Sequence, residues 1–280
     1  MANYAFPPLS HDAMTLAQTA RADAYFQAHT GFSFDQLLAP IAADAPAGGS
    51  LRGSPFYAGI RQARAGEDAS LPLGSWEREL KRADWSRVTA MAASALALHS
   101  KDLQLAVWLL QAQLQRTGLD ALAPGCCLLQ QLCARYWETL YPPAPAGDTA
   151  ARANIFHWLN EKLLRDVRLL PLARDEHGGE FGWADWEQAQ RNAALHLHPA
   201  EQEGPSIAAV LAALRATPTA SHAAMLTDLA AGRDGLEALS ASLPQHFGDA
   251  APGLGALGAL LQKMHVMLAA ELQARGVAEK

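Results

Sequence analysis

The chain has 280 residues, of which 50% are hydrophobic and 18% are charged, a composition typical of a globular protein with a sizeable core. Its formal net charge is −6 and it has no runs of lysine or arginine, which argues against a nucleic-acid partner. The sequence shows no secretory signal, and its apolar runs are far shorter than the roughly 18–20 residues that span a bilayer. We therefore expect a cytoplasmic protein without direct membrane insertion.

The first third of the chain predicts helices on both sides of a linker. Apolar residues at three- and four-residue spacing follow Ser10, a suitable N-cap, and predict the first helix. Prolines and glycines between Gly31 and Ser54 forbid a long element and predict a linker-like stretch. Ser54 and Pro55 then mark the start of a short helix that ends at Gly66.

Caps and helix breakers delimit the next helices. Asp84 is the predicted N-cap of one helix, and Ser100 that of the following one, with Asp102 in its first turn. A third helix is predicted after Pro124-Gly125, and Pro142-Pro143 ends its pattern. Short links between successive amphipathic helices favour antiparallel neighbours.

The helical pattern weakens between Leu169 and Trp186, where turn-forming residues precede a possible short strand at residues 180–184. We take this break as a boundary between two regions. The first, residues 1–175, is a helical domain. The second, residues 183–280, is a helical extension that could pack on the first as one unit.

The extension is predicted to end in a helical hairpin. Between residues 236 and 268, leucines recur at alternating three- and four-residue spacing on two successive helices, which is the pattern of a packed pair. Residue types that favour strands are scarce throughout the chain. We therefore expect an all-α fold, a multi-helix bundle of orthogonal and antiparallel helices that ends in this hairpin.

The sequence offers little that indicates catalysis or a cofactor. Cys126, Cys127 and Cys133 lie in an apolar helical pattern, so we expect reduced, buried thiols. Residues 253–258 match the letters of a dinucleotide fingerprint, but no strand precedes them, and close helix packing explains the glycines better. We find no triad and no zinc spacing. The prediction is a protein that is not an enzyme, with no catalytic residue, metal or cofactor.

One alternative from another functional class stays open. His196 and His198, with Glu201 and Glu203 nearby, have the chemistry of divalent-metal ligands. A helical protein that binds a metal or a small molecule in a cleft between the two regions would use them. It would carry that metal or ligand when purified.

The charged, tryptophan-rich segment that begins at Trp76 is interpreted as a protein-interaction site. Tryptophan is a large anchor of low conformational entropy, and Trp76 precedes a dense run of both charges. Tyr136, Trp85 and Trp108 are expected in the core, whereas Trp137 could be a core anchor or an exposed docking residue. The predicted interaction residues are Trp76, Glu77, Glu79, Lys81, Asp84, Lys101 and Trp137.

Several motifs in this order resemble the ImpA-type N-terminal domain, which is found in TssA proteins of bacterial type VI secretion systems. The resemblance covers residues 35 to 270, so the first region is identified as an ImpA-type N-terminal helical domain. The chain departs from the family between Gly49 and Gly53, which lack the acidic residues often seen there. The segments that carry the resemblance are Leu38-Ala39-Pro40-Ile41, Asp44-x-Pro46-x-Gly48, Trp76-x-x-Glu79-x-Lys81-x-Ala83-Asp84-Trp85, Ser100-Lys101-Asp102-Leu103, Tyr136-Trp137-x-x-Leu140-x-Pro142, Arg152-Ala153-Asn154, Leu169-Leu170-Pro171-Leu172 and Phe247-Gly248-x-x-Ala251-Pro252-x-Leu254.

The resemblance implies a helical, non-enzymatic assembly factor. Such proteins dock on the baseplate or the growing tail and help to coordinate polymerisation of tube and sheath. The implied partners are baseplate, inner-tube, spike and sheath proteins and the membrane complex. Longer members continue into a C-terminal domain that builds a ring. Because this sequence stops at Lys280, we expect no ring from it alone, and a homo-oligomer stays open.

Overall fold

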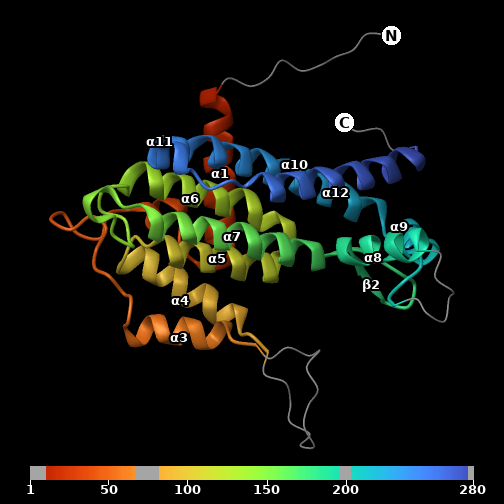
Figure 1. Ribbon diagram of the computed structural model, residues 1–280, viewed down its shortest axis with the longest axis horizontal. Helices are drawn as coiled ribbons and strands as arrows, with labels where there is room; N and C mark the ends of the chain where they lie inside the picture. The colour runs from red at the N-terminus through yellow and green to blue at the C-terminus, as the bar shows by residue number, and fades with distance from the viewer. Residues whose placement is uncertain (1–10, 67–81, 196–202, 277–280) are drawn as a thin grey trace, which may run out of the picture.

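Helices make up most of the computed structural model, which describes residues 11–66, 82–195 and 203–276 (Figure 1). The helices are α1 (His11–Thr30), α2 (Phe34–Leu38), α3 (Pro55–Arg64), α4 (Trp85–Leu98), α5 (Leu103–Thr117), α6 (Leu122–Tyr136), α7 (Ala150–Leu169), α8 (Trp183–Ala194), α9 (Ile207–Ala216), α10 (Thr219–Ser242), α11 (Pro244–Phe247) and α12 (Gly255–Ala274). Two strands, β1 (Pro171–Arg174) and β2 (Glu180–Gly182), pair antiparallel at the predicted break. The all-α prediction is confirmed, with this hairpin as a small addition.

The helices stack in layers from α3 at one side to α12 at the other (Figure 1). Helix α4 packs between α3 and α5, α6 packs between α5 and α10, and α12 contacts both α10 and α7. Helix α1 crosses the stack and packs against α6, while α8, α9 and the β-hairpin gather at one end (Figure 1). The predicted mixture of crossing and antiparallel helices is therefore present.

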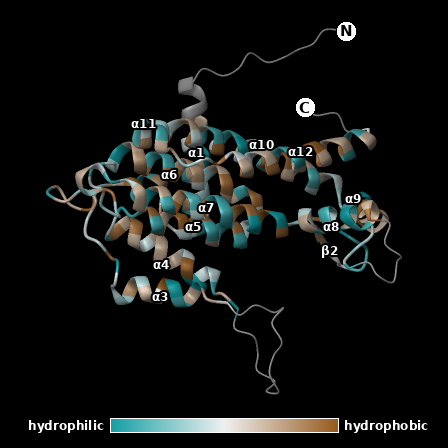
Figure 2. Cartoon of the chain, viewed as in Figure 1, coloured by the Kyte–Doolittle hydropathy of each residue, from teal (hydrophilic) through white to brown (hydrophobic). Residues whose placement is uncertain are grey.

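Buried hydrophobic residues form one cluster that runs from Ala22 to Leu272, so helices on both sides of residue 175 share a core. Figure 2 shows hydrophobic and hydrophilic residues alternating along most helices, as expected for amphipathic helices that bury one face. The boundary between residues 175 and 183 coincides with the β-hairpin. The division into two regions stays a prediction.

Helices α10 and α12 form the predicted terminal hairpin, and the leucines that predicted it are buried. Close packing by glycine occurs on the other face of α10, against α6. A Cβ at Gly235 would lie 3.1 Å from the Cα of Ala123, and one at Gly232 would lie 3.1 Å from the Cβ of Leu122. The small residues therefore let α10 approach α6 closely.

Three local predictions are corrected by the structure. The linker after Gly31 contains α2, whose capping box pairs Ser33 with Gln36. The N-cap of α5 is Asp102, which accepts a hydrogen bond from the backbone N–H of Gln104, and not Ser100. Helix α6 begins at Leu122 and includes Pro124 in its first turn, where a missing N–H costs no hydrogen bond.

The three cysteines are buried and free, as predicted. Burial raises the pKa of each thiol because it disfavours the thiolate. Within the described ranges, no helix combines the length and the apolar character that a membrane crossing requires.

Candidate protein-interaction groove

A groove of about 730 Å³ lies between α3, the start of α5 and α7. Its ends are formed by two loops, residues 50–53 and residues 141–143. Its lining includes four aromatic residues (Tyr57, Trp108, Tyr141 and Trp158) and two arginines (Arg52 and Arg61). Tyr, Trp and Arg are the residue types most often found at the energetic centre of protein interfaces. We therefore take it as the candidate functional site.

Tyr57, Trp108 and Trp158, from α3, α5 and α7, form the aromatic wall of the groove. Arg64 does not line the groove but contacts two of these rings. The ring centroids of Tyr57 and Trp108 lie 4.6 Å apart. The guanidinium carbon of Arg64 lies 4.9 Å from the centroid of Trp108 and 5.1 Å from that of Trp158. These distances are within the range of cation–π attraction, so Arg64 joins the aromatic rings of α5 and α7.

Arg64 is itself fixed by a polar network beneath the wall. Its Nε and Nη2 donate to Gln111 Oε1 at 3.1 and 2.6 Å, and Gln111 Nε2 donates to Asp166 Oδ2 at 3.3 Å. Lys162 completes the network through an ion pair with Asp166 at 2.9 Å. Burial lowers the pKa of Arg64 to about 10, so the guanidinium is still charged at neutral pH. The wall is therefore held in place before any partner arrives.

The exposed charge of the groove is positive. Arg52 and Arg61 are exposed, and neither guanidinium has a hydrogen bond or ion pair among the described residues. The acidic lining residue Asp102 is 4% exposed, and its Oδ1 accepts the N–H of Gln104 at 2.8 Å. Asp102 therefore caps α5, and within the groove it interacts electrostatically with Arg52.

Three loop segments are joined at one end of the groove by backbone hydrogen bonds. Lys101 N donates to Ala47 O at 2.8 Å, and Tyr141 N donates to Lys101 O at 2.9 Å. Arg152, which is 1% exposed, adds bonds from Nε to Pro142 O at 2.8 Å and from Nη2 to Leu140 O at 2.5 Å. Lys101 and Arg152, which belong to the sequence motifs that carry the family resemblance, therefore hold the loops that shape the groove.

The structure separates the predicted interaction residues. Trp76, Glu77, Glu79 and Lys81 lie outside the described residues. Asp84 is the predicted N-cap of α4 and accepts a hydrogen bond from Arg87 N at 2.9 Å. Lys101 follows the opposite end of that helix, about 21 Å away at 1.5 Å per residue. Asp84 and Lys101 therefore do not share one surface.

Trp137 is half-buried and clamps α11 against the rest of the bundle. Its ring stacks on His246 at a centroid distance of 4.5 Å and meets the edge of Phe247 at 5.0 Å. The Arg152 guanidinium lies 4.5 Å from its centroid. With its ring so occupied, Trp137 is primarily a packing residue. Tyr136 and Trp108 are in the core, as expected, and Trp85 is partly buried against it.

Lys101 is fully buried, which its sequence context did not suggest. Its ammonium donates to Leu37 O at 2.8 Å and to Leu96 O at 2.5 Å, and so ties α2 to the end of α4. A partner cannot reach this group without opening the core. We therefore leave Lys101 out of the interaction surface.

The burial of Lys101 predicts a pH-dependent contribution to stability. Burial lowers its pKa to about 8, whereas a lysine in an unfolded chain has a pKa of about 10.4. Between these values the unfolded chain binds more protons, so this group makes the free energy of unfolding rise with pH. The free energy of unfolding of the wild type, minus that of Lys101→Met, should rise by about 2 kcal/mol between pH 8 and pH 10. Urea unfolding at each pH measures this difference.

Comparison with the variant is needed because the buried thiols act in the opposite direction. Their raised pKa values make the wild type lose stability as the pH rises above about 8.5. That loss is common to both proteins and cancels in the difference. A difference that stays constant over this range would show that Lys101 titrates normally.

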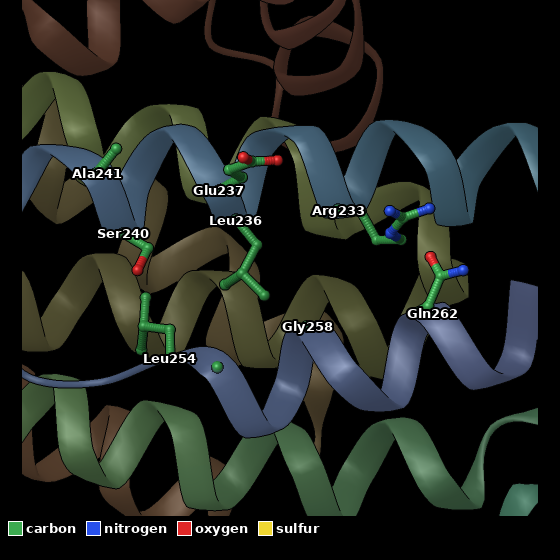
Figure 3. Close-up of a pocket in the computed structure, with 9 residues that line it drawn as sticks. Arg233, Leu236, Glu237, Ser240, Ala241, Leu254, Gly258 and Gln262 are labelled. Atoms are coloured by element: carbon green, nitrogen blue, oxygen red, sulfur yellow. The ribbon is translucent and has the colours of Figure 1, made fainter.

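The fingerprint at residues 253–258 lies at the start of α12, beside a shallow hollow against α10 (Figure 3). Gly258 faces Leu236 across this hollow, and an added Cβ would meet its Cδ2 at an ordinary 3.7 Å. At Gly253 and Gly255 an added Cβ would meet nothing within 4 Å. The close-packing explanation of these glycines is therefore wrong. A 3-10 helix and loop, rather than a strand, precede α12.

The alternative metal site falls largely outside the described residues, which exclude His196, His198 and Glu201. Glu203 is exposed, and its backbone carbonyl accepts a hydrogen bond from Asn192 Nδ2 at 2.8 Å. Within the ranges that the structure describes, no three His, Cys, Asp or Glu side chains are placed to hold a metal ion.

Sequence reasoning missed the residues that build the groove. Tyr57 and Arg61 lie one turn apart on α3, and Asn154 and Trp158 lie one turn apart on α7. A polar or charged residue four positions from an aromatic one marks a mixed helix face, and that signal could have identified the α3 and α7 sides of the groove. It could not have shown that the two faces meet.

Comparison with known proteins identifies the region that contains the groove. Residues 38–161 match the family described as "ImpA, N-terminal, type VI secretion system". The chain is also 32% identical over 179 residues to the type VI secretion system component TssA1 of Pseudomonas aeruginosa, an alignment covering 60% of this chain. Residues 38–161 therefore carry the ImpA N-terminal region, and the chain resembles TssA-type proteins.

A solved structure supports the same assignment across most of the fold. It is the N-terminal domain, including the conserved ImpA_N region, of the TssA component from Burkholderia cenocepacia, with a TM-score of 0.77 and 28% identity. The match covers 88% of this chain and 96% of that one. The P. aeruginosa alignment, in contrast, covers 49% of the relative, so this chain spans about half of that protein's length. The chain is a TssA-like component of type VI secretion, and every groove residue lies within its ImpA N-terminal region.

Proposed function

We propose that this chain is a non-enzymatic assembly component that docks on other type VI secretion proteins through the groove. The partners that we propose are baseplate, inner-tube, spike and sheath proteins, whose assembly the docking would help to coordinate. The observation that carries the proposal is the preformed aromatic wall of Tyr57, Trp108 and Trp158, whose two tryptophan rings Arg64 holds in place. Its half-buried members, Tyr57 and Trp158, offer a partner rigid aromatic surface at little entropic cost.

Blocking the groove tests this proposal. Ala151 is an exposed residue on the α7 side of the groove, so Ala151→Trp should fill the groove without disturbing the core. Ala134→Trp places the same side chain on an exposed position of α6 and serves as the control. Binding of each variant to purified baseplate, tube, spike and sheath proteins would be measured by biolayer interferometry.

The wild type should bind at least one of these proteins, and Ala151→Trp should weaken that binding at least about tenfold, because it removes access to the central contacts. The control variant should bind like the wild type. Equal binding by Ala151→Trp and the wild type would contradict docking through the groove. Trp76→Ala combined with Lys81→Ala in the same assay tests the predicted interaction segment, which stays a prediction.

A further inference from the structure

We infer that the groove accepts an acidic, extended segment of its partner, anchored by an apolar or aromatic side chain. This inference rests on the proposed docking function and names the chemistry of the docked segment. It follows from three features of the groove: its free charges, its aromatic faces and its unpaired carboxamides.

The charge of the groove differs from that of the chain. The protein carries a formal net charge of −6, yet the exposed charged side chains that line the groove are Arg52 and Arg61. Arginine binds carboxylates with two parallel hydrogen bonds, and these two guanidiniums are unpaired within the described residues. Asp102 is buried and engaged as a cap, and its electrostatic interaction with Arg52 offsets only part of this charge, leaving Arg61 without an acidic neighbour in the lining. Acidic side chains are therefore the complementary charge.

The aromatic wall supplies the site for an anchor. Tyr57 and Trp158 are half-buried, so each presents part of its ring to the groove, whereas Trp108, at 5% exposure, presents little surface. Their positions are fixed by Arg64, which contacts both tryptophan rings. Rigid aromatic surfaces of this kind favour apolar and aromatic side chains.

The remaining polar groups suit a peptide backbone. The side chains of Gln104 and Asn154 line the groove, and neither has a hydrogen bond to another described residue. A carboxamide offers a donor and an acceptor together, which is what one peptide unit of an extended segment requires. The volume of about 730 Å³ accommodates a few side chains and not the face of a domain.

The test measures binding of short overlapping peptides that cover the baseplate, tube, spike and sheath proteins of the same secretion system. We expect the bound peptides to be acidic and to contain an aromatic or large apolar residue. Their affinity should fall as NaCl is raised, because exposed charge pairs are screened. Arg52→Glu combined with Arg61→Glu should weaken binding at least about tenfold by juxtaposing like charges.

Two matched variants make the result specific. Arg135→Glu combined with Arg165→Glu changes net charge equally at exposed positions outside the groove, and should leave binding unchanged. Trp158→Ala should also weaken binding of the acidic peptides, because it removes the aromatic surface on which the anchor side chain packs. Circular dichroism should show all variants folded, since the four arginines are exposed and Trp158 is only half-buried.

The outcomes separate the inference from the proposed function. Three results would each contradict the inference that the docked segment is acidic. They are binding of neutral or basic peptides, binding of no peptide at all, and full binding by the Arg52/Arg61 double variant. If Ala151→Trp blocks capture of a whole component while that double variant does not, docking through the groove stands and only the acidic chemistry fails. If neither variant affects capture, the docking function fails as well.

Discussion

Replacing Gly48 with alanine should destabilise the protein by about 2–4 kcal/mol, although the change adds one methyl group. Gly48 has a φ of +70°, a conformation that costs residues with a Cβ about 1–2 kcal/mol. An added Cβ would lie 2.1 Å from the carbonyl oxygen of His99 and 2.9 Å from its carbonyl carbon. Backbone atoms cannot rotate away, so the loop at Gly48 must separate from the segment that follows α4.

The adjacent glycine provides the control. A Cβ at Gly49 would meet nothing within 4 Å, and its φ is outside the positive region. Gly49→Ala should therefore change stability by no more than about 0.5 kcal/mol. Urea unfolding of both variants measures the difference. If the two variants are equally stable, the close contact at His99 does not hold in solution.

Gly48→Ala should also weaken partner binding at the groove. Gly49 N donates to His99 O at 3.2 Å and Lys101 N donates to Ala47 O, so Gly48 lies inside the contact that joins two loops. The residues that follow it, from Ser50 to Gly53, form one end of the groove. A folded Gly48→Ala protein should therefore bind partners more weakly than its stability alone would predict.

Local signals in the sequence were sufficient where a helix boundary depends on neighbouring residues. Ser54 and Asp84 are N-caps as predicted, because a cap needs only its own side chain and the N–H groups that follow. Ser100 and Asp102 are both good caps by this criterion, and the local sequence cannot choose between them. Ser100 instead forms a β-bridge with Gly48, more than fifty residues away, so the helix begins after Asp102.

The groove could not be assembled from the sequence for the same reason. Tyr57, Trp108 and Trp158 lie about fifty residues apart, and only the packing of α3, α5 and α7 brings their rings together. The role of Lys101 was hidden in the same way. Lysine is usually exposed, and burial becomes tolerable here because Leu37, 64 residues earlier, supplies a carbonyl acceptor.

The second large effect is expected at Arg152. Arg152→Met should lower the free energy of unfolding by about 3–5 kcal/mol. Arg152 donates to three backbone carbonyls, those of Trp137, Leu140 and Pro142, at 2.6, 2.5 and 2.8 Å. Within the described residues these oxygens accept from no other donor, and the Arg152 side chain is 1% exposed. Methionine fills similar space but leaves three acceptors unpaired, of which that of Leu140 is buried and those of Trp137 and Pro142 are partly buried.

A second arginine on α7 provides the control for losing an arginine anywhere on this helix. Arg165 lies on the same helix and is exposed, so Arg165→Met should change the free energy of unfolding by less than about 0.5 kcal/mol. Arg152→Lys should fall between Arg152→Met and the wild type, because one ammonium cannot span three carbonyls. If Arg152→Lys is as stable as the wild type, charge and not the planar guanidinium is what residues 137–142 require. An intermediate value would show that its geometry holds the loop, and with it the Tyr141 and Pro142 side of the groove.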